Sequence, residues 1–189
     1  MSNMLLNIEI MEEFLGDYST RATGSYIAKK KNLNQKTVAN HLAALENEGI
    51  MKSRTMGKNK EYHLNLDNRE ILRHYILAAE HIRTLRFHKK NMIIRDIAEK
   101  MNKNIDGSAL IFGSYAKGIH KQDSDLDVLV IGRCNEEEID KISEMFNIEI
   151  NVKSYRKITR DTLTEEALNN HIFIKGPEKV IGAMLDAKH

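Results

Sequence analysis

The chain has 189 residues, of which 41% are hydrophobic and 30% are charged, and its formal net charge is +2. This length suits one medium domain or two small ones, and no apolar run approaches the roughly 20 residues that a membrane span requires. The N-terminus lacks the features of a signal peptide, and the single cysteine, Cys134, excludes an intrachain disulfide. We therefore expect a cytoplasmic protein with no membrane partner and, because the histidines show no ligand spacing, no zinc site.

The positive charge is distributed unevenly along the chain. Residues 21–66 contain nine Lys or Arg but only three acidic residues. The basic residues are Arg21, Lys29, Lys30, Lys31, Lys36, Lys52, Arg54, Lys58 and Lys60. A local excess of this kind indicates an anionic partner, and nucleic acid is the simplest one.

Apolar residues at helical spacing predict three helices near the N-terminus. The first covers residues 4–15, the second is expected to be capped by Ser25 and the third by Asn34. Two strand-like runs follow, Ile50–Arg54 and Glu61–Leu66, and a basic, glycine-containing turn joins them. Three helices and then a basic hairpin is the element order of a winged helix.

This first part resembles the winged helix-turn-helix of archaeal and bacterial transcription regulators, over residues 1–67. In such a domain the start of the second helix of the motif enters the major groove of DNA, and the wing lies along phosphates. The side chains expected in the groove are Gln35, Lys36, Thr37, Asn40 and His41. The wing cations are Lys52, Arg54, Lys58 and Lys60. The alternative is a protein-interaction winged helix whose charges are only solvated.

Residues 68–90 show a long helical pattern that Asp67 or Asn68 can cap. The pattern contains more apolar surface than a simple linker needs. Three roles are open for this helix: packing on the winged helix, bridging two domains, or pairing with its counterpart in a homodimer. The predicted organisation is a winged helix over 1–67, a connecting helix over 68–90 and a second domain over 91–189.

The second domain is expected to alternate helices and strands. Its first helix should turn Met92, Ile93, Ile97, Ala98 and Met101 inward. Later in the chain, Ile148–Val152 alternates as a strand should, a helix is capped by Thr162 or Thr164, and Pro177 begins the last helix. These elements belong to an α+β domain.

The most informative stretch is Ala109–Ile131, which reads as strand, glycine-serine turn, short helix, loop and strand. Asp125 and Asp127 stand at the start of the second strand, where residues two apart point to the same face. Two converging carboxylates suit a hard cation such as Mg²⁺. Gly113 allows a ligand to approach the backbone closely, and Ser114 can cap the short helix and face an anion.

Here the chain resembles the minimal nucleotidyltransferases of the DNA polymerase β superfamily, whose signature matches Gly113-Ser114-Tyr115-Ala116-Lys117-Gly118 and then Ser124-Asp125-Leu126-Asp127-Val128. The resemblance implies a mixed β-sheet with helices on one face and Mg²⁺ held by the two aspartates. It implies a nucleotide site formed by Gly113, Ser114, Lys117 and Ser124. Many members have Arg where this chain has Lys117, and Lys loses a bidentate phosphate contact.

The family also places a third carboxylate on a neighbouring strand, flanked by apolar residues, and Glu149 matches that pattern. Glu149 would act as general base on the attacking hydroxyl and would complete a two-metal site with Asp125 and Asp127. The alternative is that Glu149 is the solvent side of an edge strand. In that case the domain would bind a nucleotide without transferring it.

The sequence therefore predicts a Mg²⁺-dependent nucleotidyltransferase tethered to a DNA-binding winged helix. It would transfer a nucleoside monophosphate from an NTP, with ATP favoured, and release pyrophosphate. The acceptor is open, because members of the family modify partner toxin proteins, RNA ends or small molecules such as aminoglycosides. The second hypothesis is a transcription regulator in which the same domain senses a nucleotide without catalysis, and turnover separates the two.

Overall fold

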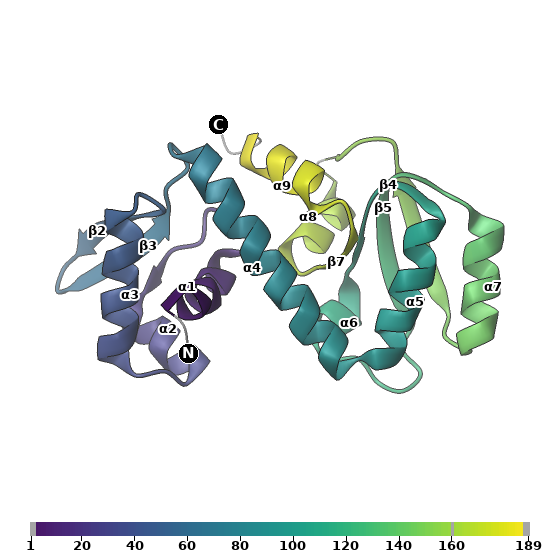
Figure 1. The fold of residues 1–189 in the computed structure, drawn as a ribbon, viewed down its shortest axis with the longest axis horizontal. Coiled ribbons are helices and arrows are strands. Elements are labelled where there is room, and N and C mark those ends of the chain that lie inside the picture. Colours follow the sequence, from purple (N-terminus) through teal and green to yellow (C-terminus); the bar gives the residue numbers. More distant parts are fainter. Residues whose placement is uncertain (1–2, 160, 187–189) are drawn as a thin grey trace. The chain divides into compact units, whose positions relative to one another are not determined.

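The computed structural model describes residues 3–159 and 161–186, and it divides into two compact units. One unit consists of the chain up to Ala79 together with the chain end from Met184, and the other is Glu80–Ala183. The division falls inside the long helix α4 (Arg69–Lys90), so that helix contributes residues to both units (Figure 1). The sequence had suggested a boundary at the end of this helix. None of the described helices is long and apolar enough to cross a membrane.

The first unit begins with a helical part: α1 (Asn3–Met11), the 3-10 helix η1 (Glu12–Phe14), α2 (Gly24–Lys31) and α3 (Gln35–Asn47). Helix α3 starts as predicted, because the Asn34 side chain accepts hydrogen bonds from the backbone N–H groups of Lys36 and Thr37. The cap of α2 is Thr23, not Ser25. The Thr23 hydroxyl accepts from the next turn at 3.2 Å, and Ser25 lies inside the helix.

This unit also contains an antiparallel sheet, with strands β1 (Ala22–Thr23), β2 (Met51–Met56) and β3 (Asn59–Leu64). The order of the strands in the sheet is β1-β3-β2. Strand β2 extends two residues further than predicted, and β3 begins and ends two residues earlier than predicted, so the turn shrinks to Gly57 and Lys58. Strand β1 was not predicted, because two residues show no alternation that could be read. Helix α3 buries Val38, Leu42 and Leu45 completely.

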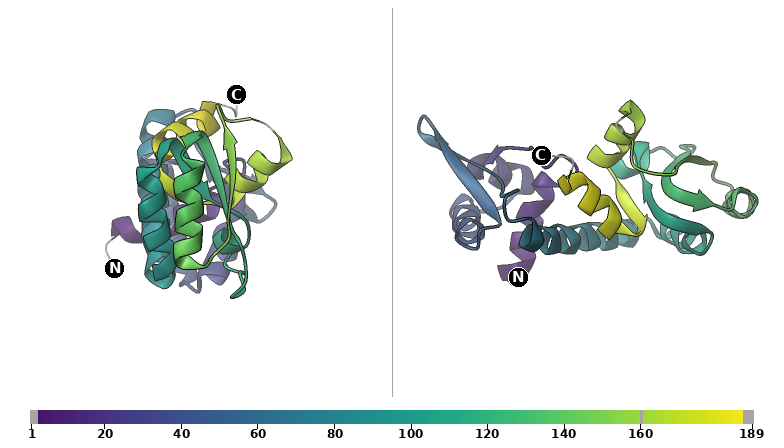
Figure 2. Two further views of the ribbon diagram at one scale, coloured as in Figure 1. Left: turned by 90° about the vertical axis from the view of Figure 1, so that its right-hand side faces the viewer. Right: turned by 90° about the horizontal axis from the view of Figure 1, so that it is seen from above.

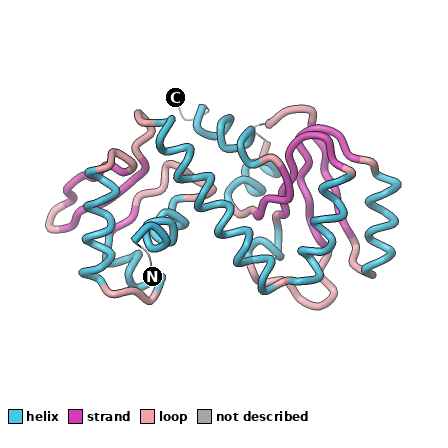
Figure 3. The backbone as a smooth tube through the Cα atoms, in the orientation of Figure 1, coloured by secondary structure: helices cyan, strands magenta, loops and turns pink. Residues whose placement is uncertain are grey.

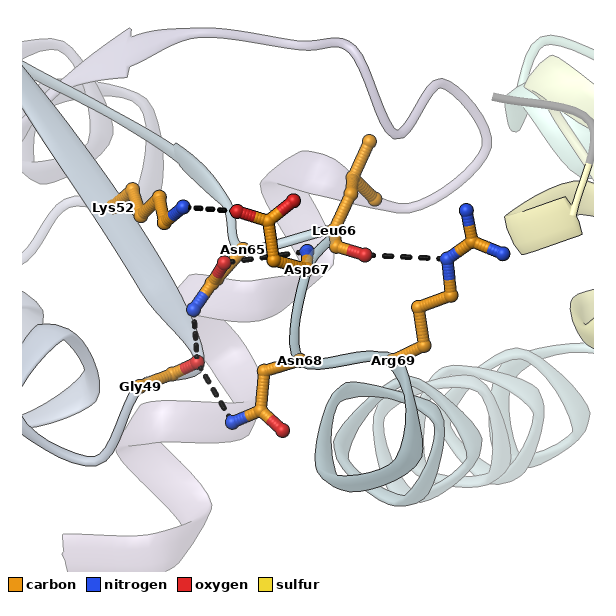
Figure 4. A network of polar contacts seen from close by, with 7 residues as sticks. All are labelled: Gly49, Lys52, Asn65, Leu66, Asp67, Asn68 and Arg69. Atoms are coloured by element: carbon orange, nitrogen blue, oxygen red, sulfur yellow. Dashed lines mark hydrogen bonds and ion pairs between the residues drawn. The ribbon is translucent and has the colours of Figure 1, made fainter. Parts of the chain in front are cut away.

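The connection from β3 to α4 is fastened by polar contacts among Gly49, Lys52, Asn65, Leu66, Asp67, Asn68 and Arg69 (Figure 4). The side-chain amides of Asn65 and Asn68 both donate to the Gly49 carbonyl, at 2.8 and 3.2 Å. Lys52 forms an ion pair with Asp67. The start of α4 is therefore tied to the turn after α3 and to β2.

The second unit is built on a β-sheet, whose strands are magenta in Figure 3. Within the described residues this sheet has four strands in the order β6-β5-β4-β7. The strands are β4 (Ile105–Ile111), β5 (Leu126–Cys134), β6 (Ile150–Tyr155) and β7 (Ile172–Lys175). Strands β5 and β6 are parallel and the other pairs are antiparallel, so the sheet is mixed, as expected. Its helices are α5 (Met92–Lys103), α6 (Gly113–Lys117), α7 (Glu136–Phe146) and α8 (Thr162–Asn169). The unit also contains α4 from Glu80 and α9 (Pro177–Asp186) as far as Ala183.

Helices α5 and α7 pack on one face of this sheet, where Leu126, Val128 and Val130 of β5 are buried. The buried side of α5 consists of Ile94, Ile97, Ala98 and Met101. The prediction that Met92 and Ile93 point inward was wrong, because they are 61% and 57% exposed. The helical stripe of positions i, i+3, i+4 and i+7 starts at Ile94 and turns the two preceding residues to solvent.

Helix α8 lies on the opposite face of the sheet from α5 (Figure 2). Its Glu166 forms an ion pair with Lys117 of α6. The expectation of helices on one face was therefore incomplete. The cap of α8 is Asp161, not Thr162 or Thr164, because the Asp161 carboxylate accepts from the Thr164 N–H at 2.8 Å.

Candidate functional site

The turn between β4 and α6 brings the backbone directly against an acidic side chain. Gly113 opens α6 with φ of +68°, and a Cβ built at this position would lie 2.3 Å from Oδ2 of Asp127. The Phe112 N–H donates to the Asp127 carbonyl at 3.0 Å and joins the turn to β5. A larger residue would therefore be strained by the positive φ and would fit only if the carboxylate or the turn moved.

Ser114 does not cap α6. The N-cap position is Phe112, which approaches in an extended conformation and offers no side-chain hydrogen bond, and Ser114 lies inside the first turn. The helix thus starts two residues earlier than a Ser114 cap would place it, directly at Gly113. It ends at Gly118, whose N–H donates to the carbonyls of Ser114 and Tyr115.

Asp125 and Asp127 stand on either side of Leu126, which is fully buried in the core. By strand alternation both carboxylates point away from that core, to the face where the Gly113 turn lies. Burial, the charge of Asp125 and the charge of Glu166 together raise the pKa of Asp127 above its ordinary value. This pair of close carboxylate donors fits Mg²⁺.

The neighbouring strand β6 adds an amide to the pair. Asn151 is in register with Asp127, and its side-chain amide donates to Oδ2 of Asp125 at 3.3 Å. Glu149 comes just before β6 and is exposed, while its carbonyl accepts from the Leu126 N–H at 2.8 Å. No group of three or more His, Cys, Asp or Glu side chains that could hold a metal is present among the described residues. The structure brings Asp125 and Asp127 together but does not gather Glu149 with them.

Lys117, at the end of α6, forms an ion pair with an acidic residue that was not predicted from the sequence. Its Nζ lies 2.7 Å from Oε1 of Glu166 on α8, and the two side chains are 35% and 52% exposed. Nothing in the sequence around Glu166 marks it, because the contact joins residues 49 positions apart. The Ser124 hydroxyl, expected at the nucleotide, accepts from the Lys121 N–H at 2.8 Å and closes the loop before β5.

An aromatic pair borders the same site. The ring of Tyr115 stacks on that of His120, with centroids 4.2 Å apart. Burial and the nearby charge of Asp125 raise the pKa of Tyr115. Neither residue was singled out in the sequence, since the pair forms only when the loop after α6 folds back.

A protein-family model described as a nucleotidyltransferase domain matches residues 92–176. This range contains the Gly113 turn, both aspartates, Lys117 and Glu166. This match supports a nucleotidyltransferase domain at residues 92–176. Searches of curated proteins and of solved structures return no match to the chain.

The first unit lies outside the range that the family model matches. It places the predicted DNA-contacting residues of α3 in different environments. Gln35, Lys36 and Asn40 are exposed, whereas Thr37 and His41 are half-buried. The Nδ1 of His41 lies 2.7 Å from the side-chain oxygen of Asn7 on α1. His41 is therefore anchored to α1 and only partly accessible at the surface of the unit.

Most of the predicted wing cations are already paired with acids. Lys52 pairs with Asp67, Arg54 with Glu61 at 2.8 Å, and Lys60 with Glu46 at 2.6 Å. Within the described part of the chain, Lys36 and Lys58 are exposed and form no ion pair. These two lysines are consequently the predicted contacts with the most readily available charge.

Proposed function

We propose that the chain is a Mg²⁺-dependent nucleotidyltransferase whose first unit binds DNA. The observation that supports the transferase activity is the position of the Asp127 carboxylate against the glycine turn, inside the range that matches the nucleotidyltransferase family. A turn without a side chain beside a carboxylate pair suits a triphosphate that arrives with a divalent cation. ATP is the nucleotide to test first.

The reaction would be an in-line transfer. An oxygen of the acceptor attacks the α-phosphorus of the NTP, the bond to the pyrophosphate oxygen breaks, and the acceptor proton leaves to a base. Asp125 and Asp127 would hold Mg²⁺, which when bound neutralises charge on the phosphate oxygens. The turn at Gly113 would present its backbone to the phosphates, and Lys117 would supply a cation for them. Glu149, exposed beside the start of β5, is our candidate for the base.

A second function is favoured by one observation, namely that no third acid joins the two aspartates among the described residues. Two carboxylates are sufficient to bind Mg²⁺ together with substrate phosphates. The domain would then sense a nucleotide and alter DNA binding without transfer. Pyrophosphate release from MgATP in the presence of protein, RNA or small-molecule acceptors would establish transfer, and binding without release would support sensing.

The nucleotide site is tested by Asp127→Asn. We expect this change to weaken MgATP binding by about tenfold or more, because interactions of charged groups contribute about 1.5–3 kcal/mol. The measurement is a calorimetric titration of the full chain with ATP, with and without Mg²⁺. Asp140→Asn removes the same charge from an exposed position on α7 and should leave binding unchanged. Equal Mg²⁺-dependent affinity in the wild type and Asp127→Asn would refute the site.

The proposal of DNA binding rests on the basic excess of residues 21–66 and on a three-helix unit with a basic hairpin. We expect Lys36→Ala combined with Lys58→Ala to weaken binding to a labelled duplex. The slope of log affinity against log salt should fall by about two, because each phosphate contact adds about 0.9. Fluorescence anisotropy at several salt concentrations measures this slope. Lys141→Ala, on α7 of the other unit, is the control, and an unaltered slope in the double variant would exclude a DNA role for these lysines.

A further inference from the structure

We propose that Glu166 is a counter-ion that competes with the triphosphate for Lys117 and thereby sets the nucleotide affinity of the domain. This inference rests on the nucleotide site proposed above. It assigns a role to a residue that lies outside the glycine turn and the aspartate pair.

The charged side chains of Lys117, Asp127 and Glu166 come from three parts of the second unit. Lys117 is the last residue of α6, the helix that begins at Gly113 against the Asp127 carboxylate. Glu166 lies in the middle of α8, 2.7 Å from the Lys117 ammonium, and close enough for its charge to act on Asp127. The Lys117 cation is thus occupied by a protein carboxylate beside the proposed phosphate position.

Helix α8 holds Glu166 in a defined place. Asp161 caps the helix, and the side chains of Thr164 and Ala167 are fully buried. Glu166 lies between these two anchored positions and is itself exposed. The carboxylate therefore reaches Lys117 from a fixed helix and not from a flexible loop.

A triphosphate at this turn would change the charge balance. Lys117 would exchange the Glu166 carboxylate for a phosphate oxygen, and the ion pair with Glu166 would be lost. Pairs with this degree of exposure are weak, so the exchange is feasible, but it reduces the net affinity for the nucleotide. Removing the charge of Glu166 should then strengthen binding.

The direction of the change in MgATP affinity distinguishes this role of Glu166 from two alternative roles. If Glu166 instead helped to hold the metal, neutralising it would weaken Mg²⁺-dependent binding. If it only stabilised α8, neutralising it would leave the affinity unchanged.

The experiment is a calorimetric titration of the full chain with MgATP for the wild type, Glu166→Gln, Lys117→Met and the double variant. We expect Glu166→Gln to bind MgATP about two- to fivefold more tightly. Most of this gain should disappear in the Lys117→Met background, because Glu166 acts through Lys117. Glu165→Gln removes a neighbouring exposed charge from the same helix and should have no effect.

Unchanged or weaker binding by Glu166→Gln would overturn the proposal, as would an equal gain with and without Lys117. The failure of the nucleotide site itself is a separate result. In that case the wild type would not bind MgATP, or Asp127→Asn would bind it equally well, and the role of Glu166 would be overturned together with the site.

Discussion

Replacing Glu80 by alanine is expected to lower the free energy of unfolding by about 3 kcal/mol, since removing one partner of a buried ion pair leaves uncompensated charge. Glu80 lies in α4 and is completely buried. One carboxylate oxygen is 2.6 Å from the Arg83 guanidinium and the other is 3.2 Å from Nε2 of His171. These contacts have ion-pair distances but not hydrogen-bond geometry, so we expect the lower end of the usual range.

The measurement is urea denaturation of the full chain followed by circular dichroism. Glu80→Gln keeps the shape of the side chain and should destabilise less than Glu80→Ala. Glu138→Ala is the matched control, because it removes an exposed i,i+3 pair with Lys141 and should cost about 0.5 kcal/mol or less. Equal destabilisation by Glu80→Ala and Glu138→Ala would show that the buried cluster does not stabilise this unit.

The same cluster predicts a dependence on pH. Burial opposes the ionisation of Glu80, but the charges of His171 and Arg83 outweigh it, so the pKa of Glu80 lies below its ordinary value of 4.5. A lowered pKa in the folded state stabilises the fold above that ordinary value, and the contribution is lost as the pH falls through the folded-state pKa. The stability difference between the wild type and Glu80→Gln should therefore shrink in acid.

The aspartate pair and Glu80 differ in how far the sequence could predict them. The Asp-x-Asp pair and the glycine turn were found because strand alternation and a local motif place them. Glu80 and Glu166 were missed, because an acidic residue in a helical pattern is ordinarily exposed to solvent. Their partners, His171 and Lys117, are remote in sequence, and only the packing of α4 and α8 on the sheet brings them together.

The DNA-facing residues show a similar limit. The basic excess of residues 21–66 is visible in the sequence, but its partial neutralisation is not. Glu46 on α3 reaches both Lys60 and Ser53 on the hairpin, at 2.6 and 2.5 Å. The sequence therefore predicted that residues 21–66 carry positive charge, but not which of the cations are available to a ligand.

Gly113→Ala is expected to lower MgATP affinity by about tenfold or more, because loss of contacts to a charged group costs about 1.5–3 kcal/mol. The added Cβ would lie 2.3 Å from Oδ2 of Asp127, so either the carboxylate or the turn must move. The positive φ of 68° adds a backbone cost of about 1–2 kcal/mol to the folded state. The change should therefore reduce both binding and stability.

Gly118→Ala separates the two effects. Gly118 has nearly the same backbone conformation, with φ of +69°, but a Cβ at this position meets nothing within 4 Å. We expect it to carry the same backbone cost of about 1–2 kcal/mol as Gly113→Ala, but without the clash, and to leave MgATP affinity within about twofold of the wild type. Calorimetric titration and urea denaturation of both variants make the comparison. If both variants lost affinity equally, backbone strain in α6 would explain the loss, and the contact between the turn and Asp127 would not determine nucleotide binding.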